Sequence, residues 1–201
     1  MLQNLITSIL AFASTNVDDI FILMLFSGGR KLRSSSIFLG QYLGIGALVV
    51  TSFAGAYLGG FFDPRYVGFL GLFPIYLAVK QFIALLKTPS GEAGTEEEPE
   101  VNATGIFSGI LAVAGVTIAN GADNIGVYVP LLATMTAAEK TQLIVVFAIM
   151  TYLWCLAAKY LASHPLIARQ LSRYGHIIMP VVLLVLGVYI LMVSRSLSLV
   201  F

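Results

Sequence analysis

Long apolar runs alternate with short polar segments along this chain of 201 residues. A helix needs about 20 predominantly apolar residues to cross the hydrocarbon core of a bilayer, and six runs have this character. They are roughly Leu5–Gly28, Ile37–Phe61, Tyr66–Leu86, Ile106–Thr134, Leu143–Ala162 and Ile177–Val193. The pattern predicts an all-α polytopic protein with six transmembrane helices in a lipid bilayer.

The composition agrees with this prediction. Hydrophobic residues make up 58% of the chain and charged residues only 10%, whereas soluble domains contain about 25% charged residues. So few charges exclude a soluble enzyme, a disordered protein and a nucleic-acid-binding domain, so that no nucleic acid is expected as a partner. The single cysteine, Cys155, excludes a disulfide within the chain and a dithiol redox site.

The basic residues between the runs predict the orientation. The connections after the first, third and fifth runs hold Arg30, Lys31, Arg33, Lys87, Arg169 and Arg173. The opposite side holds only Arg65, Lys140 and Arg195. Because basic loops stay inside the cell, we expect loops 1–2, 3–4 and 5–6 in the cytoplasm and both termini outside.

The two halves of the chain resemble each other weakly. Five positions match in order: Asn16 with Asn120, Asp19 with Asp123, Tyr42 with Tyr152, Leu43 with Leu153, and Pro74 with Pro180. Each half holds three runs, so the halves must insert with opposite topology, as in secondary transporters. We therefore predict two inverted three-helix repeats, 1–87 and 106–201, joined by an acidic, flexible linker at 88–105, with substrate bound where the repeats meet.

Three acidic residues fall inside apolar runs. Asp18 and Asp19 lie in the first run and Asp123 in the fourth, whereas the other seven acids lie in connections. A carboxylate at the centre of a bilayer costs at least about 2.5–3.5 kcal/mol and by default marks an ion or proton path. The alternative is that these acids hydrogen-bond to one another and only hold helices together.

Oxygen-bearing side chains surround these acids. Ser14 and Asp18, like Thr15 and Asp19, are spaced i, i+4 and would share a helix face. In the fourth run, Gly115, Gly121, Gly126 and Pro130 predict a break near Asn120–Asp123 that exposes backbone carbonyls. Carboxylate, amide, hydroxyl and carbonyl oxygens together indicate a site for a divalent cation.

Four other residues have two interpretations each. Gln41 and Tyr42 would project into the same cavity or form ordinary interhelical hydrogen bonds. Lys80 would reach toward the interface or act as a counter-charge for an aspartate. Cys155, in an apolar setting, is interpreted as a buried packing residue rather than a ligand.

Four motifs resemble the cadmium resistance transporter family, in particular its CadD-like members in the LysE superfamily. They are Ser14–Leu23 (STNVDDIFIL), Gly40–Gly44 (GQYLG), Gly71–Leu77 with Lys80, and Ala119–Ile125 (ANGADNI). The resemblance extends over essentially the whole chain. It implies a small exporter of Cd²⁺ in the plasma (inner) membrane, driven by the proton gradient, and not an enzyme. The site residues that match are Thr15, Asn16, Asp18, Asp19, Asn120, Asp123 and Asn124.

The residues alone do not select cadmium. Cadmium is a soft ion that favours thiolates, and an oxygen-rich site suits Mn²⁺ or Ca²⁺ as well. An exporter of those ions and a non-transporting structural membrane subunit remain alternatives, and a homo-oligomer is left open. The favoured mechanism is alternating access, in which the two halves rock and protons replace the metal. The metal and protons are then transported species, and no cofactor is permanently bound.

Overall fold

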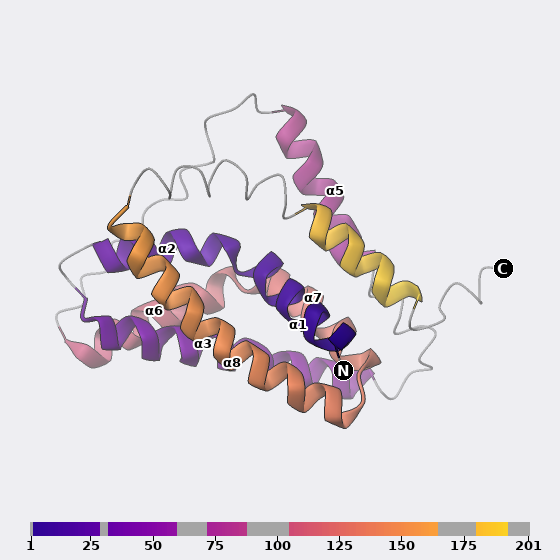
Figure 1. Cartoon of the computed structure of the whole chain (residues 1–201), viewed down its shortest axis with the longest axis horizontal. Helices are drawn as coiled ribbons and strands as arrows, with labels where there is room; N and C mark the ends of the chain where they lie inside the picture. The colour runs from indigo at the N-terminus through magenta and orange to yellow at the C-terminus, as the bar shows by residue number, and fades with distance from the viewer. Residues whose placement is uncertain (1, 29–31, 60–71, 88–104, 165–179, 193–201) are drawn as a thin grey trace.

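The chain is built from helices in this computed structural model, which describes residues 2–28, 32–59, 72–87, 105–164 and 180–192 (Figure 1). The helices are α1 (Leu2–Thr15), α2 (Val17–Gly28), α3 (Ser34–Gly59), α5 (Leu72–Lys87), α6 (Ile106–Asn120), α7 (Ala122–Thr134), α8 (Ala137–Ala162) and a C-terminal helix, Pro180–Met192. The all-α prediction is therefore confirmed for the described residues. The predicted linker, except Gly105, and most of the basic residues used for the orientation lie outside them.

Two of the apolar runs are bent helix pairs. The chain turns by 68° between α6 and α7, at Gly121, which confirms the predicted break in the fourth run. It also turns by 58° between α1 and α2, at Asn16, where one continuous helix was expected. The Asn16 side chain donates to the Phe12 carbonyl (2.8 Å), a local bond of the kind that competes with helix continuation. The expectation that Ser14 shares a helix face with Asp18, and Thr15 with Asp19, was therefore wrong, because the break separates them into two helices.

The described helices provide two to four candidate membrane spans. Both α3 and α8 have 26 residues and are apolar enough to cross a bilayer, and each bent pair qualifies if its two helices count together. The helices α5 and Pro180–Met192 are shorter and border residues that are not described. Large apolar side chains such as Val50, Phe107 and Ile149 are exposed. Surfaces of this kind suit lipid rather than water, which supports an integral membrane protein.

Glycines bring α3 and α6 into close contact. A Cβ atom added to Gly40 would lie 2.6 Å from Cβ of Val113, and one added to Gly44 would lie 2.6 Å from Cβ of Thr117. Neither position has room for a side chain, so the backbones can approach this closely only because both residues are glycine. Residues four apart on α3 meet residues four apart on α6 in the same order, so the two helices run parallel.

The bent pair α1–α2 has the same relation to α8 (Figure 1). Asn4 donates to Glu139 near the start of both segments (2.5 Å). Near their ends, a Cβ atom on Gly28 would lie 3.9 Å from Cβ of Ala162. These contacts again follow the same order along both chains, so α8 runs parallel to α1–α2.

The packing divides the helices into two bodies, each drawn from both halves of the sequence. The first body comprises α1, α2 and α8, and the C-terminal helix lies across a cavity from α1. The second body comprises α3, α5, α6 and α7. The pairs α3–α6, α3–α7, α2–α8 and α1–α8 pack more extensively than α3 does on α8, α1 on α7, or α2 on α3. The site therefore has to be sought where the two bodies meet.

Candidate metal centre

The three aspartates lie at the beginnings of the helices that follow the two breaks. Asp18 and Asp19 are in the first turn of α2, and Asp123 is in the first turn of α7. The N-terminal end of a helix carries partial positive charge and favours nearby carboxylates. Both breaks therefore present acids in the same local setting.

The local hydrogen bonds identify which residues are equivalent. Oδ1 of Asp18 accepts the backbone N–H of Asp19 (3.0 Å), and Oδ1 of Asp123 accepts the N–H of Asn124 (2.9 Å). Asp18 thus corresponds to Asp123, and Asp19 corresponds to Asn124. This register differs by one residue from the alignment read from the sequence, which paired Asp19 with Asp123.

Asp19 is tied to two other helices through Gln41. The Asp19 side chain is only 4% exposed, and its Oδ2 accepts a hydrogen bond from Nε2 of Gln41 on α3 (2.9 Å). Oε1 of Gln41 accepts a hydrogen bond from the hydroxyl of Thr117 on α6 (2.7 Å). Gln41 was expected either to project into the cavity of the acids or to form interhelical hydrogen bonds, and the structure shows two interhelical bonds, one of them to Asp19.

A second polar cluster joins the two helix breaks. The amide of Asn16 donates to the hydroxyl of Tyr128 on α7 (2.8 Å), and this hydroxyl also lies 2.8 Å from Oγ1 of Thr15. Nδ2 of Asn124 donates to Oδ1 of Asn16 (3.3 Å). From α8, the indole N–H of Trp154 donates to the backbone carbonyl of Asn16 (2.6 Å). The two breaks are thus in direct contact through buried polar side chains.

Negative charge concentrates where the breaks meet. Asp19 interacts electrostatically with both Asp18 and Asp123, and Asp123 also interacts with Asp18. Like charges this close in a low-dielectric setting need a cation or protons to neutralise them. Asn124 is 2% exposed, and its Oδ1 accepts no hydrogen bond. A buried acceptor without a donor is costly, and a cation would satisfy it.

The acids do not form a closed cage. Within the part of the chain that the structure describes, no three His, Cys, Asp or Glu side chains are close enough together to hold a metal ion. Asp18 is exposed, Asp123 is half-buried and Asp19 is buried. A divalent cation bound here would have to complete its shell with amide, hydroxyl or backbone oxygens, which Ca²⁺-type coordination readily uses.

The other predicted site residues have different surroundings. The hydroxyl of Ser14 bonds to the Ala11 carbonyl of its own helix (3.0 Å). Asn120, half-buried, ends α6 and is separated from Asp123 by the break. The hydroxyl of Tyr42 donates to the Ala148 carbonyl of α8 (2.7 Å). Of its two expected roles, Tyr42 thus forms an interhelical hydrogen bond. Lys80 is exposed on α5.

Three residues of these clusters were not predicted from the sequence: Thr117, Tyr128 and Trp154. Thr117 is a polar residue within the apolar stretch Ile110–Ala119. A polar residue in an apolar run is also the pattern that identified the aspartates. Tyr128 follows Asn124 by one helical turn and shares its face. Trp154 has no comparable local signal, because its role depends on α8 crossing the Asn16 break.

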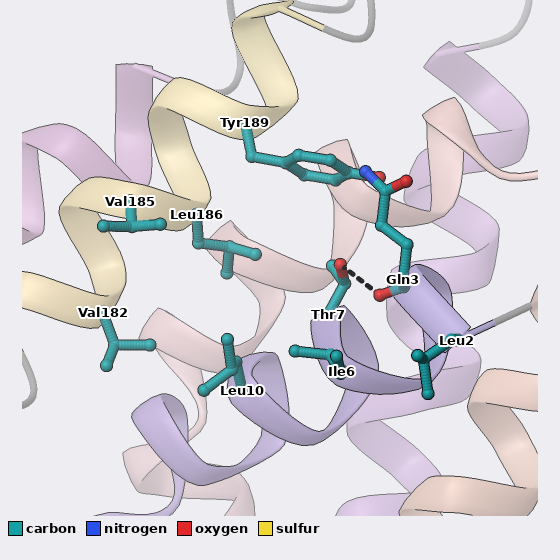
Figure 2. Close-up of a pocket in the computed structure, with 9 residues that line it drawn as sticks. All are labelled: Leu2, Gln3, Ile6, Thr7, Leu10, Val182, Val185, Leu186 and Tyr189. Carbon is teal, nitrogen blue, oxygen red and sulfur yellow. Dashed lines mark hydrogen bonds between the residues drawn. The ribbon is translucent and has the colours of Figure 1, made fainter.

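A cavity of about 340 Å³ lies elsewhere, between α1 and the C-terminal helix (Figure 2). Figure 2 shows Leu10 and Val182 facing each other across it, with Gln3 and Tyr189 at one end. Its lining contains no acid and is mainly apolar. A cavity of this character does not suit a metal ion.

Comparison with known proteins gives one match. The family model described as cadmium resistance transporter matches residues 12–201. No curated protein and no solved structure matches the chain.

Proposed function

Because the chain belongs to the cadmium resistance transporter family, we propose that it exports Cd²⁺ across the plasma membrane by alternating access, in exchange for protons. The family is one of transporters, so the expectation that the chain is not an enzyme is confirmed. One observation carries the proposed site. Each bent span breaks beside its aspartates, and the two breaks contact each other through Asn16 and Asn124.

The ion binds between the beginnings of α2 and α7. Asp18 and Asp19 provide charge from the first body, and Asp123 provides it from the second. Asn124 offers its unpartnered Oδ1 as a neutral ligand. The remaining proposed ligands are Thr15, Asn16 and Asn120. Discontinuous helices with ion sites at their broken ends are characteristic of secondary transporters.

The parallel course of α3 and α6 supports six spans. Since both helices run in the same direction, the chain must return across the membrane an odd number of times between them. The helix α5 is the described element of that stretch. With the C-terminal helix as a sixth span, loops 1–2, 3–4 and 5–6 share one side, in agreement with the proposed cytoplasmic placement and with both termini outside.

Equivalent contacts between α3 and α8 support inverted repeats. Tyr42 bonds to the carbonyl of Ala148, and the ring of Tyr152 lies edge-on to that of Phe38, with centroids 5.5 Å apart. If Tyr42 is equivalent to Tyr152, then Phe38, four residues earlier, is equivalent to Ala148. The contact of Tyr42 with Ala148 therefore becomes the contact of Tyr152 with Phe38 when the two halves are interchanged.

Proton coupling follows from the carboxylates. Two protons balance the charge of one divalent ion, and three acids are available at the site. Protonation outside the cell would release the metal, and the protonated site would return. Mn²⁺ or Ca²⁺ export, within the LysE superfamily, is the second candidate, because the ligand atoms are oxygens.

Asparagine substitutions test the site. We expect Asp19→Asn and Asp123→Asn each to reduce Cd²⁺ export at least about tenfold, because each removes a charge that offsets the divalent ion. Cellular accumulation of radioactive cadmium measures this, normalised to the amount of protein in the membrane. Ser52→Ala is the control, because the Ser52 hydroxyl bonds only within its own helix, to Leu48.

Three results would change the assignment. Normal export by both asparagine variants contradicts the proposed site. Reduced abundance with unchanged export per molecule favours a structural subunit. In proteoliposomes, stronger competition by Mn²⁺ or Ca²⁺ than by unlabelled Cd²⁺ favours the second candidate, and cadmium transport that is insensitive to a pH gradient contradicts proton exchange.

A further inference from the structure

Gln41 connects the two bodies at the acid site. It belongs to α3 in the second body, and the carboxylate that it contacts, Asp19, belongs to α2 in the first. The side chain is fully buried. A buried amide has to satisfy both its donor and its acceptor, and Gln41 does so with partners on different bodies.

Thr117 and Asp19 hold the two ends of this amide. The Thr117 hydroxyl donates to Oε1 of Gln41 (2.7 Å), and Nε2 donates to Oδ2 of Asp19 (2.9 Å), whose carboxylate can only accept. The reversed amide would set two acceptor oxygens against each other. Gly40 and Gly44, on either side of Gln41, hold α3 against α6, so the backbones that carry Gln41 and Thr117 cannot separate easily.

We propose that Gln41 is a positioning residue of the metal site: anchored at its oxygen by Thr117, its amide holds the Asp19 carboxylate from the opposite body. This inference rests on the proposed function. One oxygen of Asp19 is engaged by Gln41, which aims the remaining acceptor capacity of the carboxylate at the cation. Because the bond joins the two bodies, it breaks and re-forms as they move in the transport cycle.

Two substitutions test this with a matched control. Gln41→Leu removes both hydrogen bonds at similar side-chain size, and Thr117→Val removes only the hydroxyl that anchors the amide oxygen. Thr151→Val is the control, because Thr151 is also buried in an apolar helix, but its hydroxyl bonds to its own helix, at Phe147 (2.8 Å). Initial rates of radioactive Cd²⁺ transport in proteoliposomes give KM and the maximal rate for each variant.

We expect KM for Cd²⁺ to rise about tenfold with Gln41→Leu and at least about threefold with Thr117→Val, because hydrogen bonds to charged groups exceed ordinary ones in strength. Thr151→Val should stay within about twofold of the unmodified protein. In an Asp19→Asn background, Gln41→Leu should weaken Cd²⁺ binding to the purified protein, measured by equilibrium dialysis, by less than about twofold, because the carboxylate that it positions is gone.

Two results would overturn the inference. One is an unchanged KM for Cd²⁺ in both Gln41→Leu and Thr117→Val. The other is a change in these variants that is confined to protein abundance or thermal stability. If Gln41→Leu does not fold, Thr117→Val decides. If Asp19→Asn and Asp123→Asn abolish transport while these two variants match Thr151→Val, only the role of Gln41 fails. If the aspartate variants transport normally, the proposed function of the site fails.

Discussion

Substitution of Cys155 tests whether the soft ion Cd²⁺ needs a sulfur ligand in addition to the oxygens of the site. The side chain is 1% exposed and packs in an apolar cluster with Ile20, Leu23 and Ala158. We expect Cys155→Ala to keep Cd²⁺ transport within about twofold, because an alanine loses packing but no ligand. Vesicle uptake of Cd²⁺ and Mn²⁺ measures this, with Cys155→Ser to separate polarity from size. Selective loss of Cd²⁺ transport in both variants would identify sulfur as a ligand.

Asn124 provides a second test at the level of one residue. If its buried Oδ1 binds the cation, Asn124→Leu should raise KM for Cd²⁺ about tenfold, because leucine has no oxygen that could coordinate the metal at this position. The control is Asn4→Leu, the same change at a position that bonds to Glu139. Direct binding of Cd²⁺ to the purified protein, by equilibrium dialysis, checks the result. Equal affinity in Asn124→Leu and Asn4→Leu would show that Asn124 only links helices.

At the scale of helices, the two breaks differ in how far the sequence predicts them. Glycines around Asn120–Asp123 are poor helix formers, and the break lies at one of them, Gly121. Around Asn16 there is neither glycine nor proline. Besides the local bond from Asn16 to Phe12, this break has side-chain bonds to Tyr128 on α7 and from Trp154 on α8 to the Asn16 carbonyl. Both partners are more than a hundred residues away, so no local pattern reveals them.

The packing at Gly121 allows a prediction for the second break. A Cβ atom there would collide with the side chain of Leu48, whereas one at Gly115 on the same bent pair would meet open space. Overpacking costs about 1–3 kcal/mol, and replacing glycine by alanine within a helix gains about 0.5–1 kcal/mol. Gly121→Ala should therefore lower the melting temperature and slow transport, and Gly115→Ala should do neither. Thermal unfolding in detergent and vesicle uptake compare the two, and equal behaviour would contradict close packing at the break.

At the scale of the molecule, the sequence predicts the halves but not the bodies. Order-preserving matches such as Tyr42 with Tyr152 are visible in one chain, so a repeat can be predicted. The pairing of helices depends on contacts such as that of Gly44 with Thr117. The spacing of Gly40 and Gly44 predicts a close helix contact but does not indicate which helix packs there. Because the described helices group each bent pair with the long helix of the other half, two mixed bodies are the alternative to the sequence halves as the moving parts.

Cross-linking distinguishes these two kinds of motion. In a Cys155→Ala background, Gly28→Cys with Ala162→Cys joins α2 to α8 within the first body, where the Cβ separation of 3.9 Å suits a disulfide. Phe38→Cys with Tyr152→Cys, joined by a short bifunctional thiol reagent, links α3 to α8 and hence the two bodies.

We expect the first link to leave most Cd²⁺ transport intact and the second to abolish it reversibly, because only the second prevents the bodies from separating. Transport before and after reduction, or with a cleavable reagent, measures this. If the halves moved instead, both links would block transport, since each joins residues from different halves. Inhibition by the Gly28–Ala162 link would therefore contradict the mixed bodies.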